Sequence, residues 1–489
     1  MLWCATRSWK GKPMTTILAI DQGTSGTKAI AVDPARGILA TAEEPVRPAY
    51  LGAGAVEQAP GQLLSSVLAA GHRALQAAGR AADVITLANQ GETVMAWDPA
   101  TGTPLSPAIG WQDRRAEKLC AGLADHKQWV AQRTGLVLDP YFSAPKMAWL
   151  RRTLTAEGVV TTTDTWLVWH LTGKYVTDAS TASRSLLTGL DTGDWDPELL
   201  SLFELSDEPL PTIVASDEIV GTTREFGRPA PVAGLILDQP AALAAEACLE
   251  AGTAKCTFGT GAFLLANSGR RAARSAAGLT TSVAWRARGR TLYCLDGQVY
   301  TAASAVRWIQ ELGLIRSAAD LDRAAAEEGD GTLCVPALAG LGAPWWRSDA
   351  TGSFTGMTVS TTPGHLVLAL VQGIAAQVAE LAALMQADLG APLTRLRADG
   401  GLTRSRVLMQ ATANLMQIPV EVYPSPNATA LGAAALGRLA IEPALDLPEA
   451  ILDWMPADSY EPIWSADRAA DYRGRWRAAV SATLPGEPA

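Results

Sequence analysis

The feature that most constrains the fold is the segment 17–30, which reads ILAIDQGTSGTKAI. An apolar run ends at the carboxylate of Asp21, passes through glycines and hydroxyl residues to Lys28, and then re-enters an apolar run. This pattern predicts a β-hairpin that delivers Asp21 to a glycine-rich tip. The N–H groups, hydroxyls and lysine of such a tip suit phosphate oxygens, and the carboxylate suits Mg²⁺ held through water. An ordinary polar turn is the alternative.

A second segment, 253–266, repeats this pattern with a strand-like run, the turn Gly259-Thr260-Gly261 and another apolar run. Two such hairpins that face each other across a cleft could grip one polyphosphate from both sides. Neither hairpin matches the P-loop pattern GxxxxGK[ST]. Leu264 stands at the third glycine position of the dinucleotide fingerprint, so a Rossmann dehydrogenase is disfavoured as well.

Strand-like and helix-like stretches alternate along the chain and predict an α/β protein. The expected strands cover 17–20, 29–32, 84–88, 232–237 and 393–398, and the expected helices cover 61–79, 159–173, 240–249, 363–390 and 405–417. We expect two domains, 15–248 and 249–445, followed by an extension over 446–489. Met14 directly precedes the first strand, so residues 1–14 are expected to form a disordered extension.

Composition narrows the class of partner. The net charge of -9 argues against binding to nucleic acid. No stretch has about 18 uninterrupted apolar residues, so we expect no membrane span. The six cysteines show no CxxC spacing and the four histidines show no metal-ligand spacing. This usage predicts reduced, mostly buried cysteines in a cytoplasmic protein with small-molecule ligands.

Nine short segments carry a resemblance to a known family, and they follow in the order 21–28, 89–93, 109–115, 139–146, 178–184, 238–239, 259–263, 340–346 and 399–401. With them, the chain resembles the FGGY carbohydrate kinases, sugar and polyol kinases of the actin-like ATPase superfamily, and within these the glycerol kinases. The resemblance covers about 17–439 and implies two actin-like (ribonuclease H-like) ATPase domains with a cleft between them. It also implies transfer of the ATP γ-phosphoryl group to a hydroxyl of a small polyol or sugar, in a homodimer or homotetramer.

By this resemblance, Asp238 is the catalytic base and Asp21 positions Mg²⁺. The residues themselves agree for Asp238, because it ends an apolar strand and precedes Gln239, an amide suited to a sugar hydroxyl; a helix N-cap is its alternative role. The resemblance assigns the phosphate contacts to Thr24, Ser25, Gly26, Lys28, Gly259, Thr260 and Gly261. It assigns the rest of the nucleotide site to Ala303, Arg307, Gly400, Gly401 and Ser405. Of these, Ala303, Arg307 and Ser405 depart from the Gly, Gln and Asn usual in glycerol kinases.

The resemblance also predicts an acceptor pocket that consists of Gly91, Glu92, Trp111, Tyr141, Asp238, Gln239 and Phe263. Glycerol kinases typically carry an arginine where this chain has Gly91. Losing a charged hydrogen bond typically costs about 1.5–3 kcal/mol, so glycerol should bind less well, and the vacated space could admit a tetritol, a pentitol or a xylulose-type ketose. Alternatively, another arginine such as Arg114 or Arg115 takes its place.

Two other functions stay open at this point. A weakly active sugar- or nucleotide-binding sensor would account for Gly91, Ala303 and Ser405. An actin-like ATPase of the chaperone or filament type is disfavoured, because nothing that resembles a peptide-binding domain follows residue 440.

Overall fold

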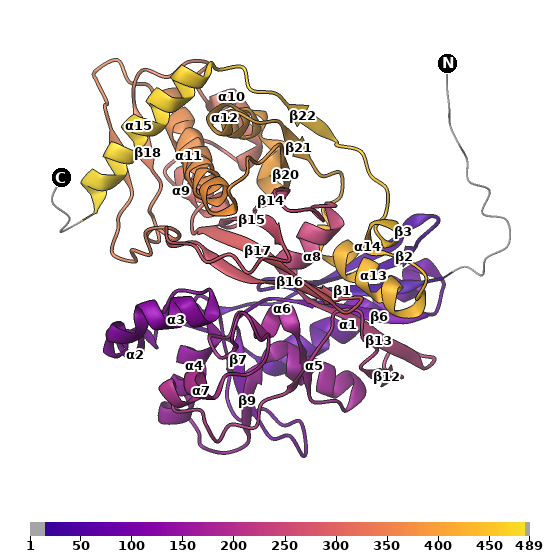
Figure 1. Ribbon diagram of the computed structural model, residues 1–489. Coiled ribbons are helices and arrows are strands. Elements are labelled where there is room, and N and C mark those ends of the chain that lie inside the picture. The colour runs from indigo at the N-terminus through magenta and orange to yellow at the C-terminus, as the bar shows by residue number, and fades with distance from the viewer. Residues whose placement is uncertain (1–14, 485–489) are drawn as a thin grey trace, which may run out of the picture.

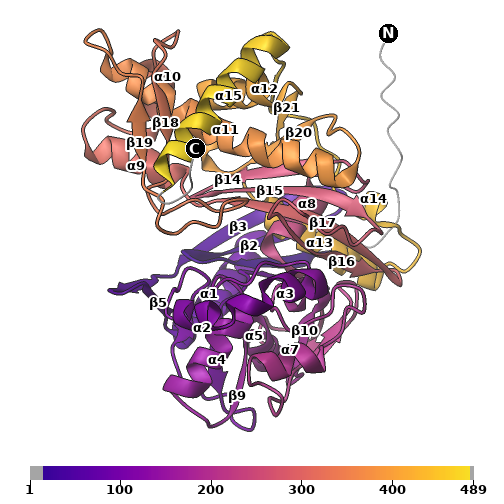
Figure 2. The same ribbon diagram turned by 60° about the vertical axis from the view of Figure 1, so that its left-hand side comes forward.

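The computed structural model describes residues 15–484, so the predicted extension over 1–14 lies outside the described residues. The described chain forms two α/β lobes that lie one on the other (Figures 1 and 2). Each lobe is built around one large mixed sheet. The first lobe contains most of the first half of the chain, and the second lobe contains most of the second half.

The sheet of the first lobe has the strand order β12-β13-β6-β1-β2-β3. These strands are β12 (Gly221–Thr223), β13 (Ala230–Leu237), β6 (Val84–Asn89), β1 (Ile17–Gln22), β2 (Gly26–Asp33) and β3 (Gly37–Pro45). β1 pairs antiparallel with β2, and β1, β6 and β13 run parallel. The parallel strands are apolar runs buried on both faces, which is typical of parallel sheets covered by helices.

The sheet of the second lobe has the order β16-β17-β15-β14-β20-β21-β22. Its strands are β16 (Thr280–Ala287), β17 (Arg290–Val299), β15 (Ala262–Gly269), β14 (Ala254–Phe258), β20 (Leu396–Asp399), β21 (Val420–Val422) and β22 (Asp458–Tyr460). Its centre repeats the pairing of the first lobe, because β14 is antiparallel to β15 and parallel to β20, which is parallel to β21. This repeated arrangement confirms the two predicted ribonuclease H-like, actin-like domains.

Smaller elements surround the two sheets. A five-stranded sheet of the first lobe contains β4 (Ala49–Leu51), β5 (Ala55–Gln58), β8 (Ala108–Ile109), β7 (Val94–Trp97) and β9 (Val159–Thr162), and two short pairs join β10 (Val176–Asp178) to β11 (Thr212–Val214) and β18 (Leu333–Val335) to β19 (Ser353–Thr355). The helices of the first lobe are α1 (Pro60–Ala78), α2 (Glu117–Gly122), α3 (Lys127–Thr134), α4 (Ser143–Thr153), α5 (Thr163–Thr172), α6 (Ala179–Ala182) and α7 (Pro197–Leu202). The later helices are α8 (Asp238–Ala245), α9 (Ala303–Glu311), α10 (Leu321–Ala324), α11 (Pro363–Leu389), α12 (Arg406–Met416), α13 (Ala428–Ile441), α14 (Leu447–Ala450) and α15 (Ala466–Thr483).

Helices α8 and α13 lie between the two sheets (Figure 1). Both are rich in alanine, and their small side chains let the two helices pack closely against each other and against β13 and β6. Although α13 comes late in the chain, it packs on the sheet of the first lobe. The predicted domain boundaries at 248/249 and 445/446 stay predictions. Helix α13 follows the first boundary in the chain, yet it packs against strands that precede that boundary.

Most predicted elements are present, with one clear correction. The helix expected over 159–173 divides into β9 and α5, because the β-branched residues 159–162 pair with β7 as a strand before the helix begins. The helix α11 is long and apolar enough to cross a membrane by length and composition, but 89% of its most apolar window is buried inside the protein. Five described cysteines are free and buried, as predicted: Cys120, Cys248, Cys256, Cys294 and Cys334.

Candidate active site

The parallel strands of the first lobe bring the predicted catalytic carboxylate close to the first hairpin. Gln22 at the end of β1 lies beside Asn89 of β6, and Asn89 lies beside Leu237 of β13. The neighbouring residues Asp21 and Asp238 therefore lie close together at the carboxyl ends of these parallel strands, where open α/β sheets usually bind ligands. In the second lobe, Asp399 is the last residue of β20, and its negative charge acts on Asp21.

These three carboxylates concentrate negative charge in a poorly solvated place. Burial raises the pKa of Asp21 to about 7, and repulsion from Asp238 and Asp399 contributes, while Lys28 opposes the rise. Burial likewise raises the pKa of Asp238 and of Asp399, and Lys255 opposes both shifts. Within residues 15–484, no three His, Cys, Asp or Glu side chains are grouped closely enough to hold a metal ion by themselves. A cation here would need water or phosphate oxygens to complete its shell, as Mg²⁺ usually does.

Asp238 is the first residue of α8, and its Oδ1 accepts the backbone N–H of Gln239 at 2.7 Å. The N-cap position itself belongs to Leu237, so the predicted N-cap role of Asp238 is wrong by one residue. The Gln239 amide has a fixed orientation, because its Oε1 accepts a hydrogen bond from Lys255 Nζ at 2.5 Å. Its Nε2 consequently lies on the side of the Asp238 carboxylate, 3.4 Å from Oδ2.

The tip of the first hairpin is held by side chains from outside it. The Thr24 hydroxyl accepts a hydrogen bond from Trp111 Nε1 at 2.9 Å, and the Thr24 carbonyl accepts one from Gln58 Nε2 at 2.7 Å. Because the hydroxyl accepts from Trp111, its own hydrogen stays available for a phosphate oxygen. Ser25 is exposed at the tip, while Lys28 Nζ donates to the carbonyl of Pro426 at 3.3 Å.

The second hairpin tip adjoins the start of helix α9. The carbonyls of Gly259 and Thr260 accept N–H groups from residues 302–304, and the Thr260 side chain is exposed. A Cβ at Gly261 would lie 2.4 Å from the carbonyl oxygen of Val299, so only glycine allows this close approach. Ala303, the first residue of α9, is thus hydrogen-bonded to the predicted phosphate turn.

The remaining predicted nucleotide residues divide between two helix starts. Arg307 lies one turn along α9 and is exposed. Gly400 follows β20 with φ +94°, and Gly401 begins the turn that leads to α12. The Ser405 hydroxyl caps α12 and donates to Asp322 Oδ1 at 2.7 Å, so this side chain already has a structural role.

Five of the seven predicted acceptor residues line one narrow cavity of about 20 Å³, close to the space needed for one water molecule, and Gly91 and Trp111 do not line it. A polyol can therefore enter only when the lobes part or side chains move. The predicted residues that line this cavity are Glu92, Tyr141, Asp238, Gln239 and Phe263. The Trp111 ring lies edge-on to the rings of Tyr141 at 5.6 Å and Phe263 at 6.2 Å between centroids.

The predicted space beside Gly91 is filled by the end of the Leu237 side chain, so a longer acceptor would have to displace that side chain. A Cβ at Gly91 would lie 2.7 Å from Leu237 Cδ1, so the Leu237 side chain occupies that volume. Neither arginine suggested as a substitute lines the cavity. Arg114 pairs with Asp139 and Glu117, and Arg115 pairs with Asp113 and Glu57.

A guanidinium does reach the acceptor cavity, but it comes from Arg184, to which the sequence analysis gives no role. Arg184 is 3% exposed; its Nε lies 2.6 Å from Glu92 Oε1 and its Nη1 lies 2.6 Å from Asp296 Oδ2. Burial opposes its charge, but Glu92 and Asp296 outweigh burial and raise the pKa of Arg184 well above its usual value. In the sequence, the one indication of a role for Arg184 is its position at the end of the segment 178–184, which belongs to the resemblance.

Two further features support the cavity, one at the predicted acceptor residue Glu92 and one at Lys146, which has no predicted role. Glu92 has a positive φ of 57°, an unusual conformation for a side-chain-bearing residue, and the ion pair with Arg184 helps to hold it. Lys146, on α4, is buried and donates to the carbonyls of residues 140–142 at 2.5–2.8 Å. It therefore fixes the backbone that carries Tyr141 into the cavity.

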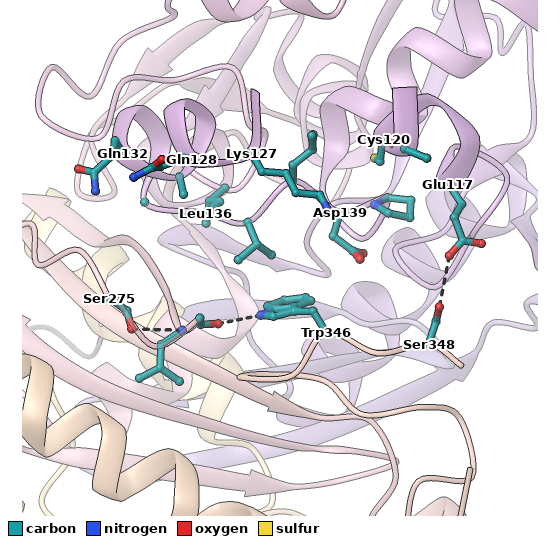
Figure 3. A pocket seen from close by; sticks show the side chains of 18 of the residues that line it. Glu117, Cys120, Lys127, Gln128, Gln132, Leu136, Asp139, Ser275, Trp346 and Ser348 are labelled. Carbon is teal, nitrogen blue, oxygen red and sulfur yellow. Dashed lines mark hydrogen bonds between the residues drawn. The ribbon is translucent and has the colours of Figure 1, made fainter. Parts of the chain in front are cut away.

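A larger cavity of about 610 Å³ lies between the lobes (Figure 3). Its walls come from α2, α3 and residues 135–140 of the first lobe and from residues 274–279, Trp346 and Ser348 of the second. Ser348 donates a hydrogen bond across it to Glu117 at 3.3 Å (Figure 3). None of the predicted catalytic or binding residues lines this cavity, so it is separate from the site around Asp238.

The repeated lobes and the two hairpins at their facing strand ends define a two-lobed kinase of the actin-like ATPase fold. The model of the N-terminal domain of the FGGY family of carbohydrate kinases matches residues 16–243, and that of the C-terminal domain matches residues 254–441. The chain belongs to the FGGY family of carbohydrate kinases. It is therefore an ATP-dependent kinase that phosphorylates a hydroxyl of a polyol or sugar.

Individual relatives agree with this family. The chain is 44% identical over 448 residues to a glycerol kinase from Alkalilimnicola ehrlichii, covering 88% of this chain and 90% of that protein. Among solved structures, a Plasmodium falciparum glycerol kinase with ADP has a TM-score of 0.89 at 31% identity, covering 97% of this chain and 99% of the other. A xyloylose kinase from Brucella ovis has a TM-score of 0.86 at 26% identity, covering 96% and 99%.

Proposed function

We propose that this kinase acts on an acceptor of glycerol size. The observation that carries the proposal is the acceptor cavity, which is narrow, closed beside Gly91 by Leu237, and lined by Asp238, Glu92 and Arg184. Carboxylates and a guanidinium suit the hydroxyls of a short polyol, whereas a longer chain would need the volume that Leu237 fills. The relatives named glycerol kinase support the same acceptor.

The chemical step follows from the position of Asp238 at the head of α8. Its carboxylate takes the proton of the acceptor hydroxyl while the hydroxyl oxygen forms a bond to the γ-phosphorus of ATP. The bond from that phosphorus to the β–γ bridging oxygen breaks, and ADP leaves. Gln239 orients the acceptor beside Asp238, and closure of the lobes keeps water from competing for the phosphoryl group.

The hairpin tips are proposed to hold the ATP phosphates, with Thr24 and Lys28 on the first lobe and Thr260 on the second. Asp21 would hold Mg²⁺, because burial and repulsion from the neighbouring carboxylates raise its pKa, and a cation would relieve the cost of its charge. When bound, Mg²⁺ would neutralise charge on the phosphates. We propose that the exposed Arg307 and the Gly400-Gly401 turn flank the adenine ring of ATP.

ADP release measured with glycerol, erythritol, xylitol and xylulose tests this proposal. We expect the highest kcat/KM with glycerol, and a loss of turnover in Asp238→Asn with ATP binding retained. A higher kcat/KM for a C4 or C5 acceptor would refute the size argument. Thermal stabilisation by these ligands without any turnover would instead support the sensor. A homodimer or homotetramer, and a cytoplasmic location, stay predictions that light scattering and cell fractionation can test.

A further inference from the structure

One buried carboxylate oxygen in the acceptor cavity has no partner. Asp296, on β17 of the second lobe, is 5% exposed and lines the same cavity as Glu92 and Asp238. Its Oδ2 accepts hydrogen bonds from Arg184 Nη1 at 2.6 Å and from Gln298 Nε2 at 2.5 Å. Its Oδ1 is buried and makes no hydrogen bond.

This arrangement differs from an ordinary structural ion pair. A guanidinium and a carboxylate commonly pair through two parallel hydrogen bonds that use both carboxylate oxygens. Here Arg184 divides its donors, with Nε on Glu92 and Nη1 on Asp296, and leaves Asp296 Oδ1 unused. A buried acceptor without a donor is costly, and native proteins rarely leave one unless a ligand or water supplies the missing hydrogen.

We propose that Asp296 Oδ1 binds a hydroxyl of the acceptor, so that the second lobe contributes directly to acceptor recognition. This inference rests on the proposed function. The acceptor then carries one hydroxyl that Asp238 deprotonates, one that faces Glu92 and one that donates to Asp296. It must therefore be a triol or a longer polyol, and a diol lacks one of these contacts.

The same geometry links recognition to lobe closure. Glu92 belongs to the first lobe and Asp296 to the second, and Arg184 joins the two carboxylates. An acceptor that bonds to both carboxylates is held completely only when the lobes are together. Asp296 thus makes the closed arrangement, in which water is excluded, depend on a correctly hydroxylated acceptor.

The test compares Asp296→Asn and Asp296→Ala with the wild-type enzyme on glycerol, 1,2-propanediol and 1,3-propanediol. In Asp296→Asn the amide oxygen must face Arg184, so Nδ2 replaces the free acceptor Oδ1 with a donor. We expect kcat/KM for glycerol to fall about 10- to 100-fold, mainly through KM. For the propanediol that lacks the hydroxyl bound by Asp296, kcat/KM should fall less than about 3-fold, because that contact is already missing.

The matched control is Asp191→Asn, which removes another carboxylate paired across the lobes, with Arg274 Nη2 at 2.6 Å, at an exposed place outside the cavity. This control should change kcat/KM for none of the three acceptors by more than about 2-fold. Equal losses on glycerol and on both diols, or no loss on glycerol, would overturn the role of Asp296. If Asp296→Ala does not fold, the nearly isosteric Asp296→Asn carries the test.

Failure of the proposed function has a different signature. A wild-type enzyme that releases ADP with other acceptors of the C3–C6 series but not with glycerol refutes the glycerol-sized acceptor. In that case, stabilisation against heat by glycerol still tests Asp296. A rise in Tm with glycerol in the wild type that disappears in Asp296→Asn supports the contact, and a rise that is equal in both, or absent in both, contradicts it.

Discussion

Replacing Lys255 by methionine tests the electrostatics of the active site most directly. Lys255 is 0% exposed, and its Nζ donates to Gln239 Oε1 at 2.5 Å and to Thr257 Oγ1 at 2.7 Å. Its charge is the largest influence that lowers the pKa of Asp238 and of Asp399 against the effect of burial. Methionine has a similar length but supplies neither a charge nor a hydrogen-bond donor.

The expected magnitude has two parts. The substitution removes two hydrogen bonds from a buried charged donor, each typically worth about 1.5–3 kcal/mol of stability, so the Tm should fall by several degrees. Without Lys255, the pKa of Asp238 rises further, and the base stays protonated to higher pH. The loss of a nearby opposite charge should move the acidic limb of kcat/KM upward by on the order of one pH unit. At the acidic end of the profile, this amounts to a roughly tenfold slower reaction.

The assay is ADP release from pH 5 to 9 at saturating ATP, with the Tm measured under the same conditions. Lys28→Met is the matched control, because Lys28 lies on the phosphate hairpin and donates to the carbonyl of Pro426 rather than to Gln239. It should raise KM for ATP and, through the loss of the charge that lowers the pKa of Asp21, move the acidic limb less than Lys255→Met does. A folded Lys255→Met enzyme whose acidic limb coincides with that of the wild type would refute the reasoning.

Three further predictions follow from contacts in the site. Burial lowers the pKa of Lys146 to about 7, so above that pH Lys146 loses the ammonium charge that holds the carbonyls of residues 140–142; KM for the acceptor should rise between pH 7 and 9, and Lys146→Met should remove this dependence. In Gly91→Arg the new Cβ would meet Leu237 Cδ1 at 2.7 Å, so the end of the Leu237 side chain must turn away; kcat/KM for glycerol should fall modestly, and adding Leu237→Ala should restore it; a loss that Leu237→Ala does not relieve would contradict this packing. Gly261→Ala should raise KM for ATP about tenfold because its Cβ would meet a carbonyl oxygen at 2.4 Å, whereas Gly259→Ala, whose nearest neighbour is 3.8 Å away, should change it little; equal effects of the two would count against the tight turn.

The two hairpins are features that the sequence predicts well, because each depends on neighbouring residues. Apolar strands joined by glycine-rich turns appear at β1–β2 and β14–β15. The long helix α11 also depends on neighbouring residues. Its apolar positions form one continuous segment, which the N-cap Thr362 directly precedes and the C-cap Gly390 directly follows. The strand β9 is missed because pairing with β7, which lies far away in the sequence, decides its conformation.

The sequence by itself determined the class of this kinase and five of the eleven residues that line its acceptor cavity, because the motifs that carry them are short and keep their order. Only the tertiary structure decided how that cavity is filled and charged. Leu237 occupies the space that Gly91 suggests is empty, and Arg184 meets Asp296 across 112 positions of the chain. The space left in a cavity and the pairing of charges inside it depend on which strand ends and lobes pack together. Residue spacing along the chain does not specify that packing.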